Sequence, residues 1–153
     1  MSESTEIVLS GNSVRTEIAN LSKGQTSVFS TITGDGFAPK AALLAALSNS
    51  VAVQENLDKH IELVNIVVES IDLVNEGSGE LETQPRVILV DADGTAYHAI
   101  SGPMFRDVQR LLAVMGHPAT WPAPLGVKIA REGQGTRKYF VLKLDLEAAP
   151  AKK

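Results

Sequence analysis

The chain has 153 residues, of which 44% are hydrophobic and 21% are charged. This length suits one domain with a substantial core, and the composition excludes a wholly disordered chain. Because the sequence contains no cysteine, disulfide scaffolds, cysteine-based zinc sites and thiol catalysis are excluded as well. The sequence has no apolar run of about 18 residues, and residues 1–10 do not resemble a signal peptide, so we expect no membrane partner.

The formal net charge of −4 disfavours a nucleic acid partner, but the charges are unevenly distributed. Residues 54–82 contain eight acidic residues and one lysine. Residues 125–143 contain one acidic residue and five basic ones, namely Lys128, Arg131, Arg137, Lys138 and Lys143. The folded chain can therefore present a basic face while it stays acidic overall, although both segments are equally compatible with ordinary solvated surfaces.

The first third of the chain predicts one strand and one helix. Residues 1–22 are polar, and we expect them to form a loosely attached arm. Residues 26–33 are rich in β-branched side chains in a strand pattern, which Gly34 and Gly36 interrupt. Pro39 suits the first turn of a helix, and the alanines and leucines that follow favour a helix up to about Leu47.

The longest apolar stretch, residues 60–74, is rich in β-branched residues and predicts a strand rather than a helix. At its centre both alternating sets of residues are apolar, whereas one set carries Glu62 and Asp72 near the ends. This pattern indicates a strand that bends and serves two halves of a closed sheet. Residues 76–84 are rich in glycine and glutamate and predict a loop.

The middle of the chain predicts a hairpin followed by a helix. Residues 86–91 and 95–100 have strand patterns, and the Asp93-Gly94 dipeptide between them is a strong turn signal. Ser101 is a natural N-cap, and an apolar stripe at helical spacing indicates a helix that Gly116 ends.

The last third predicts a linker and two more strands. Residues 117–124 contain three prolines and Trp121, which indicates an extended, non-helical linker. Residues 127–130 and 139–146 alternate as strands do, and residues 133–135 supply a turn between them. We expect residues 148–153 to be a disordered tail.

Five strands with a helix between the third and the fourth are the order of an OB-fold, a small Greek-key barrel. We therefore predict a mainly β protein with a single OB-fold domain over residues 23–147. The barrel spans residues 60–146 in this prediction, and residues 26–49 form an N-terminal strand-helix extension. An open α+β sheet is the alternative that the same elements allow.

OB barrels commonly bind single-stranded nucleic acid, with bases stacked on aromatic rings and phosphates paired with cations. The aromatic and cationic candidates are Tyr97, Tyr139, Trp121, Arg86, Lys128, Arg131, Arg137 and Lys143. Structural roles compete with these assignments, because Tyr139 also suits an ordinary surface position and Trp121 a cap packed over the helix. The four phenylalanines are most simply core residues.

The segment VDADGTAYHAIS, followed by a helix, a linker and two strands, resembles the single-stranded DNA-binding proteins of small tailed bacteriophages. The resemblance covers mainly residues 87–146, and the family's pattern falls on Asp93, Gly94, Tyr97, Ala99, Ile100 and Ser101. It implies an OB-fold and sequence-independent binding of single-stranded DNA, with Tyr97 as a stacking residue. It also implies a role in phage genome replication in the cytoplasm of the infected bacterial host, with replication proteins such as a DNA polymerase as partners.

Two other functions remain open. The DADGT motif at Asp91 is similar to the nucleophile motif of haloacid-dehalogenase-type phosphatases, in which an aspartate attacks phosphorus beside Mg²⁺. A strand follows this motif at once, which favours a simple Asp-Gly turn. The second alternative is a protein-interaction module that uses residues 54–82. The dispersed His60, His98 and His117 do not have the spacing of a zinc site, and we expect no cofactor, no metal and no enzymatic activity.

Overall fold

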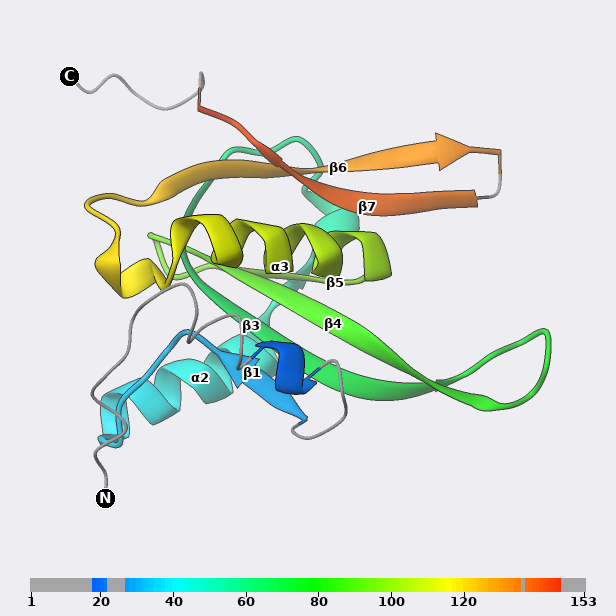
Figure 1. Cartoon of the computed structure of the whole chain (residues 1–153), viewed down its shortest axis with the longest axis horizontal. Coiled ribbons are helices and arrows are strands. Elements are labelled where there is room, and N and C mark those ends of the chain that lie inside the picture. The colour runs from blue at the N-terminus through cyan, green and yellow to red at the C-terminus, as the bar shows by residue number, and fades with distance from the viewer. Residues whose placement is uncertain (1–17, 22–26, 136, 147–153) are drawn as a thin grey trace.

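A curled β-sheet with helices on both of its faces forms the protein (Figure 1), and the computed structural model describes residues 18–21, 27–135 and 137–146. The strands are β1 (Val28–Ser30), β2 (Val51–Ala52), β3 (Ile61–Val74), β4 (Leu81–Asp91), β5 (Ala96–Ile100), β6 (Leu125–Gln134) and β7 (Arg137–Leu144). The helices are α2 (Phe37–Asn49) and α3 (Gly102–Met115), and two short 3₁₀ turns are η2 (Val53–Glu55) and η3 (Pro118–Thr120).

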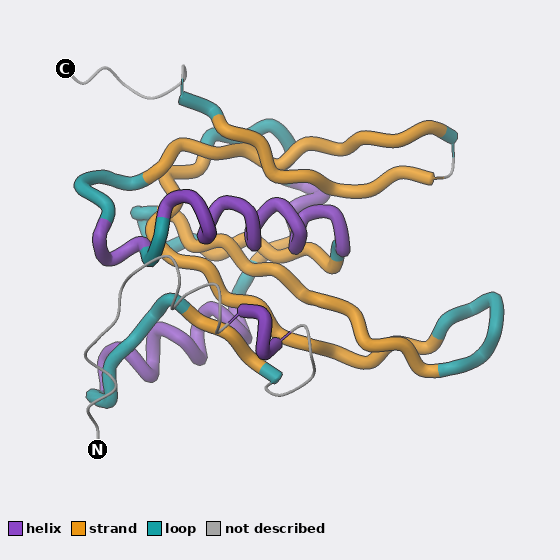
Figure 2. Tube along the Cα trace, in the orientation of Figure 1, coloured by secondary structure: helices purple, strands orange, loops and turns teal. Residues whose placement is uncertain are grey.

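The strand order is β2-β5-β4-β3-β6-β7, and β1 pairs with β3 beside this path. Among the described strands, only β2 and β5 pair in parallel. The five strands from β3 to β7 and the helix α3 between the third and the fourth of them reproduce the predicted order. The sheet curls into a half-barrel (Figure 2), so the OB-like barrel predicted from the sequence is confirmed.

The long strand β3 bends at a β-bulge. Its register with β4 shifts between Leu63 and Asn65, which changes the set of side chains that faces inward. Leu63 before the bulge and Ile66 after it both lie in the main core, although one has an odd number and the other an even one. Val67 belongs to a second core on the opposite face. The bend predicted from two apolar sets of residues is therefore confirmed.

Each face of the sheet carries its own apolar core. The main core fills the concave face, where α3 contributes Met104, Val108 and Leu112. The smaller core lies on the other face and includes Ala46 of α2 and Ile88 of β4. None of the described helices is long and apolar enough to cross a membrane.

The helix α3 begins and ends at the residues that the sequence indicates. The Ser101 hydroxyl accepts a hydrogen bond from the Met104 N–H at 3.1 Å and donates one to the Phe140 carbonyl at 2.9 Å. Gly116 follows the helix with a φ of 76°, a conformation that favours glycine. One side chain therefore caps α3 and also ties its start to β7.

Two segments differ from the secondary structure that the sequence predicts. β4 begins at Leu81, inside the expected loop, because β3 and β4 stay paired in a hairpin that continues beyond the barrel. The linker contains the helical turn η3, at whose start the His117 Nδ1 accepts a hydrogen bond from the Ala119 N–H at 3.0 Å. The expectation of an extended linker without helix is therefore wrong over these three residues.

The expected N-terminal arm is also corrected in part. Residues 18–21 form a short helical segment, and Ile18 and Leu21 are buried in the main core. These four residues are therefore attached to the barrel by their apolar side chains. The other residues of the expected arm, 1–17 and 22, lie outside the described part of the chain, as does the expected tail at residues 148–153.

Candidate nucleic-acid interface

Two β-hairpins project from the same end of the barrel, at the right of Figure 1. The acidic arm, residues 69–86, is the outer part of β3 and β4 and carries Glu69, Asp72, Glu76, Glu80 and Glu82 against the single Arg86. The basic arm, residues 128–143, is made by β6 and β7 and carries Lys128, Arg131, Arg137, Lys138 and Lys143 against the single Glu132. Because the two arms have opposite charge, a polyanion is attracted to one and repelled by the other.

The pairing of β6 with β7 decides which side chains of the basic arm share a face. Directly paired residues point to the same side of an antiparallel ribbon. Arg131 pairs with Phe140, and Glu132 pairs with Tyr139. The two faces of this ribbon therefore each carry one aromatic ring, and cations lie on both.

Arg131 and Phe140 are in contact on one of these faces. The guanidinium of Arg131 lies over the Phe140 ring, 5.6 Å from its centre. Phe140 packs against the main core with its other side, whereas Arg131 is exposed. The cation–π attraction keeps the guanidinium flat on the ring, so that its outer side is directed to solvent and suits a phosphate or a base.

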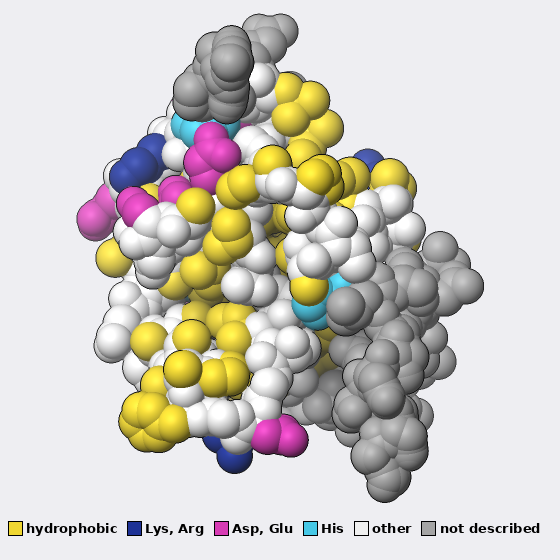
Figure 3. Space-filling model, turned by 90° about the vertical axis from the view of Figure 1, so that its left-hand side faces the viewer, with side chains coloured by type: hydrophobic (Ala, Val, Ile, Leu, Met, Phe, Trp, Pro, Cys, Tyr) yellow, Lys and Arg dark blue, Asp and Glu magenta, His cyan; other side chains and the backbone are white. Residues whose placement is uncertain are grey.

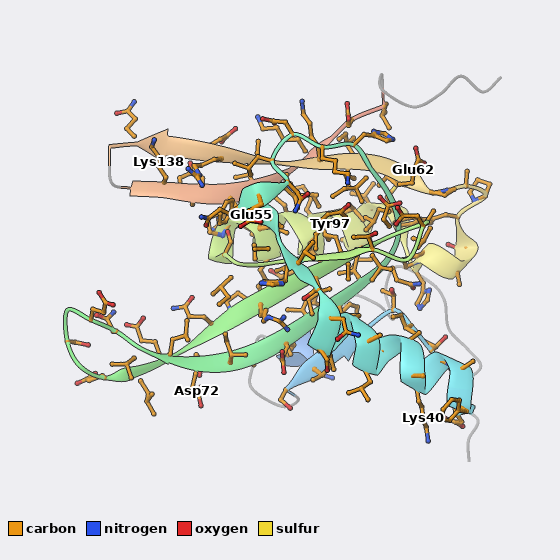
Figure 4. The ribbon with its side chains drawn as sticks, turned by 180° about the vertical axis from the view of Figure 1, so that it is seen from behind. Lys40, Glu55, Glu62, Asp72, Tyr97 and Lys138 are labelled. Carbon is orange, nitrogen blue, oxygen red and sulfur yellow. The ribbon has the colours of Figure 1, made fainter. Side chains whose placement is uncertain are left out.

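The other face exposes Tyr139, whose side chain is 41% accessible to solvent. Lys138 is exposed near the far end of the arm (Figure 4), but it pairs with Gly133 and therefore lies on the face of Arg131 and Phe140. A half-exposed ring on one face and exposed cations on the other supply a stacking surface and phosphate partners, which a single-stranded nucleic acid site requires.

The remaining cations of the arm differ in how much of their charge the chain itself neutralises. The Lys143 ammonium lies 2.6 Å from the Glu132 carboxylate. The hydrogen bond with Glu132, with smaller contributions from Asp107 and Asp58, raises the pKa of Lys143. Lys128 is half-buried and makes no ion pair with any described residue. Lys143 is therefore the cation least able to take a phosphate.

Tyr97 does not lie on the basic arm or on any exposed surface. Its side chain is 1% exposed and belongs to the main core, near the middle of the molecule in Figure 4. Tyr97 pairs with Leu89 and Ala99 pairs with Val87, so these four residues share the concave, inward face. The expectation that Tyr97 offers its ring to a base is therefore corrected, because the ring is buried in the main core.

Arg86 has a structural position on the convex face. Its guanidinium donates hydrogen bonds to Glu69 at 3.1 Å, to the Ser50 hydroxyl at 3.0 Å and to the Leu47 carbonyl at 3.2 Å. These contacts tie the C-terminal end of α2 to the sheet. Arg86 is therefore occupied within the fold and is not brought together with the cations of the basic arm.

Trp121 contacts the C-terminal end of α3, which lies at the opposite end of the molecule from the two arms (Figure 1). Its indole N–H donates to the Met115 carbonyl at 3.0 Å and to the Gly116 carbonyl at 3.2 Å. It thereby satisfies carbonyl groups at the C-terminal end of α3, which have no partner within the helix. The structure agrees with the alternative stated from the sequence, a cap packed over the helix.

The sequence predicts all four phenylalanines as core residues, but one of them lies outside the core. Phe29 is buried, and Phe105 and Phe140 pack against the main core, but Phe37 is 88% exposed at the start of α2. Figure 3 shows apolar side chains gathered near this end of the molecule and few basic ones. The contact between Arg131 and Phe140 was not predicted, because the turn expected at residues 133–135 would place Arg131 opposite Arg137, whereas β6 continues to Gln134, which pairs with Arg137.

The DADGT segment forms a tight turn instead of a catalytic site. The Asp91 carboxylate accepts a hydrogen bond from the Asp93 N–H at 3.2 Å, and the Asp93 carboxylate accepts one from the Thr95 N–H at 2.8 Å. The hydrogen bonds with Thr95 lower the pKa of Asp93. β4 and β5 then pair antiparallel across the turn, whereas the phosphatase hypothesis requires a parallel sheet with a crossover helix. That hypothesis is wrong, and no cluster of metal-ligating side chains is present within the described ranges.

Comparison with known protein families gives a match that covers most of the chain. The sequence pattern of a family described as phage single-stranded DNA-binding protein matches residues 22–146. No curated protein and no solved structure matches the chain significantly. The matched residues include all seven strands, both long helices and the whole basic arm. The chain therefore belongs to the phage single-stranded DNA-binding protein family.

Proposed function

We propose that this protein binds single-stranded DNA without sequence preference along its basic arm and coats it during phage genome replication. The observation that carries the proposal is the Arg131 guanidinium held over the Phe140 ring on an exposed cationic ribbon. In this proposal Tyr139 supplies a stacking surface, Phe140 holds the Arg131 guanidinium in place, and phosphates are bound by Lys128, Arg131, Arg137 and Lys138. Arg137 is included for its place at the start of β7.

The chemistry of the arm favours single strands over duplexes. Bases expose their faces only when they are unpaired, and stacking on an aromatic ring is tolerant of sequence because every base has such a face. A flexible strand can also follow the basic arm while it avoids the acidic arm nearby. A stiff duplex has neither advantage, so we expect the protein to discriminate against it.

Titration of labelled oligonucleotides by fluorescence anisotropy tests this function. We expect tight binding to oligo-dT and to mixed-sequence single strands, and much weaker binding to a duplex of the same length. The logarithm of the affinity should fall linearly with the logarithm of the salt concentration, by about 0.7 per phosphate contact. Equal affinity for single strands and duplex, or no binding to either, would contradict the proposal.

A contact with replication proteins is the second candidate function, and the acidic arm favours it. Val74 and Leu81 are directly paired near the tip of this arm and both are exposed. An apolar pair among carboxylates suits a partner with a basic, partly apolar surface, such as a DNA polymerase in the cytoplasm of the infected host.

A shortened acidic arm tests this second function. Asp72 and Thr83 are directly paired, so an Asn-Gly turn joined to them closes the hairpin after residues 73–82 are removed. We expect this variant to keep its affinity for oligo-dT and to lose binding to the purified phage DNA polymerase in surface plasmon resonance. Unchanged polymerase binding would exclude the arm as the contact.

A further inference from the structure

The outer edge of β7 is covered over only part of its length. β7 pairs with β6 along one edge. On the other edge, the Ser101 hydroxyl donates to the Phe140 carbonyl at 2.9 Å, and the Asp107 carboxylate accepts from the Leu142 N–H at 3.0 Å. The N-cap of α3 and its first half thus bind the Phe140 carbonyl and the Leu142 N–H, and no described residue of α3 bonds to the edge beyond Leu142.

Leu144 lies on the uncovered part of this edge. The Asp145 N–H bonds to the Gly126 carbonyl of β6 at 2.9 Å. Because backbone groups alternate between the two edges of an antiparallel strand, the N–H and the carbonyl of Leu144 point outward. Neither group has a hydrogen-bond partner among the residues that the structure describes. Such an edge is a template for another strand.

An apolar groove lies between this edge and α3. It has a volume of about 320 Å³ and is lined mainly by Leu111, Val114, Met115, Leu125, Leu142 and Leu144. The Leu144 side chain is 58% exposed. A strand added to the edge at this place therefore finds backbone partners and an apolar surface for its side chains together.

The sequence of the edge is complementary to itself. Residues 142–146 read Leu-Lys-Leu-Asp-Leu. When two such segments pair antiparallel with Leu144 opposite Leu144, Leu142 is opposite Leu146 and Lys143 is opposite Asp145. All the leucines then lie on one face, and each lysine lies opposite an aspartate on the other. His60 donates to Asp145 at 2.9 Å and holds this carboxylate in place.

We propose that this edge is an interface between two copies of the chain, in which β7 of each copy pairs antiparallel with β7 of the other around a two-fold axis at Leu144. The same patch serves both copies, as a two-fold interface requires. Since β7 runs from the tip of the basic arm toward Leu144 (Figure 1), the two basic arms point in opposite directions. The pair then offers two DNA-binding arms to one strand.

Sedimentation equilibrium of the full chain without DNA tests the interface. We expect the wild-type mass to rise with concentration toward that of two chains. Leu144→Lys places a charge on the edge and should weaken association by about tenfold or more. Leu44→Lys is the matched control, because Leu44 is a similarly exposed leucine, at 63%, on α2, and this variant should associate like the wild type.

A cross-link tests the register. The chain has no cysteine, so Leu144→Cys introduces a single thiol. Directly opposed residues in a hydrogen-bonded antiparallel pair lie about 5.5 Å apart, within the span of a disulfide. Mild oxidation should link Leu144→Cys into dimers and leave Leu44→Cys unlinked.

Three results would overturn the proposed interface: a wild-type chain that stays monomeric at all concentrations, a Leu144→Lys variant that associates as the wild type does, or a Leu44→Cys variant that cross-links equally fast. Because these measurements contain no DNA, their failure leaves the proposed DNA-binding function untouched.

Discussion

The Arg131 guanidinium lies 5.6 Å from the centre of the Phe140 ring, on directly paired positions of β6 and β7. Phe140 is anchored in the main core on its other side, so the barrel itself positions a cation near the start of an exposed arm. A side chain held in this way loses less freedom when it binds a phosphate than a fully mobile lysine does.

The cations of the basic arm should determine the salt dependence of DNA binding. Arg131→Ala and Lys138→Ala should each weaken the binding of oligo-dT, and each should reduce the slope of log affinity against log salt by about 0.7. Anisotropy titrations at several salt concentrations measure both quantities. Lys40→Ala is the control, because Lys40 is an exposed lysine on α2, far from the arm (Figure 4). A slope that the arm variants leave unchanged would contradict the assignment.

The exposed Tyr139 ring should contribute stacking free energy. Tyr139→Ala should lose about 1–3 kcal/mol of binding free energy on every single-stranded sequence, whereas Tyr139→Phe keeps the ring and should bind nearly as the wild type does. Phe37→Ala removes an exposed ring at the other end of the molecule and should have no effect. Equal losses in the Phe37 and Tyr139 variants would show that the effect does not arise at the arm.

Tyr97 should contribute to the stability of the fold and should not stack on DNA bases. Tyr97→Ala should lower the free energy of unfolding by about 3–5 kcal/mol, because it leaves a large cavity in the main core. The buried Tyr97 hydroxyl has no hydrogen-bond partner in the described structure, so Tyr97→Phe should be neutral or stabilising. Urea denaturation measures both changes. A loss of DNA affinity in a fully folded Tyr97→Phe variant would show that the hydroxyl reaches the DNA.

His60 should make stability depend on pH in a defined direction. Its Nε2 lies 2.6 Å from Glu62 and its Nδ1 lies 2.9 Å from Asp145. The hydrogen bond with Glu62, followed by that with Asp145, raises the pKa of His60. The folded state therefore binds the proton more tightly, and the resulting stability is complete below a pH of about 6.5 and is lost as pH rises through the raised pKa. His60→Gln should cost more free energy of unfolding at pH of about 5.5 than at pH of about 8.5.

A His98 variant is the matched comparison, because its effect on the free energy of unfolding should depend on pH in the opposite direction. Burial, with a smaller contribution from Arg86, lowers the pKa of His98. Its contribution to stability is therefore complete above a pH of about 6.5 and is lost as pH falls from there through the lowered pKa of the folded state. Urea denaturation of His98→Gln should show the larger loss at the higher pH. The same pH dependence in both variants would contradict the assigned environments.

The sequence by itself determined the order of the elements and several of their ends. The Asp93-Gly94 turn, the Ser101 cap and the bend in residues 60–74 depend on contacts between residues that are close in the chain or on one strand's own alternation. Local backbone preferences and apolar periodicity are enough to predict such features. The family pattern at residues 93–101 likewise indicates single-stranded DNA as the ligand from sequence alone.

Only the tertiary structure decided which face each side chain occupies. Strand pairing directs Tyr97 into the concave core, and the close approach of α2 to the sheet occupies Arg86 with Glu69 and Ser50. Partners far apart in the sequence set these outcomes, because a shift of register by one residue moves every side chain of a strand to the other face. For the same reason no local pattern reveals that the Leu144 backbone has no partner among the described residues, since the hydrogen bonds from α3 to β7 end at Leu142.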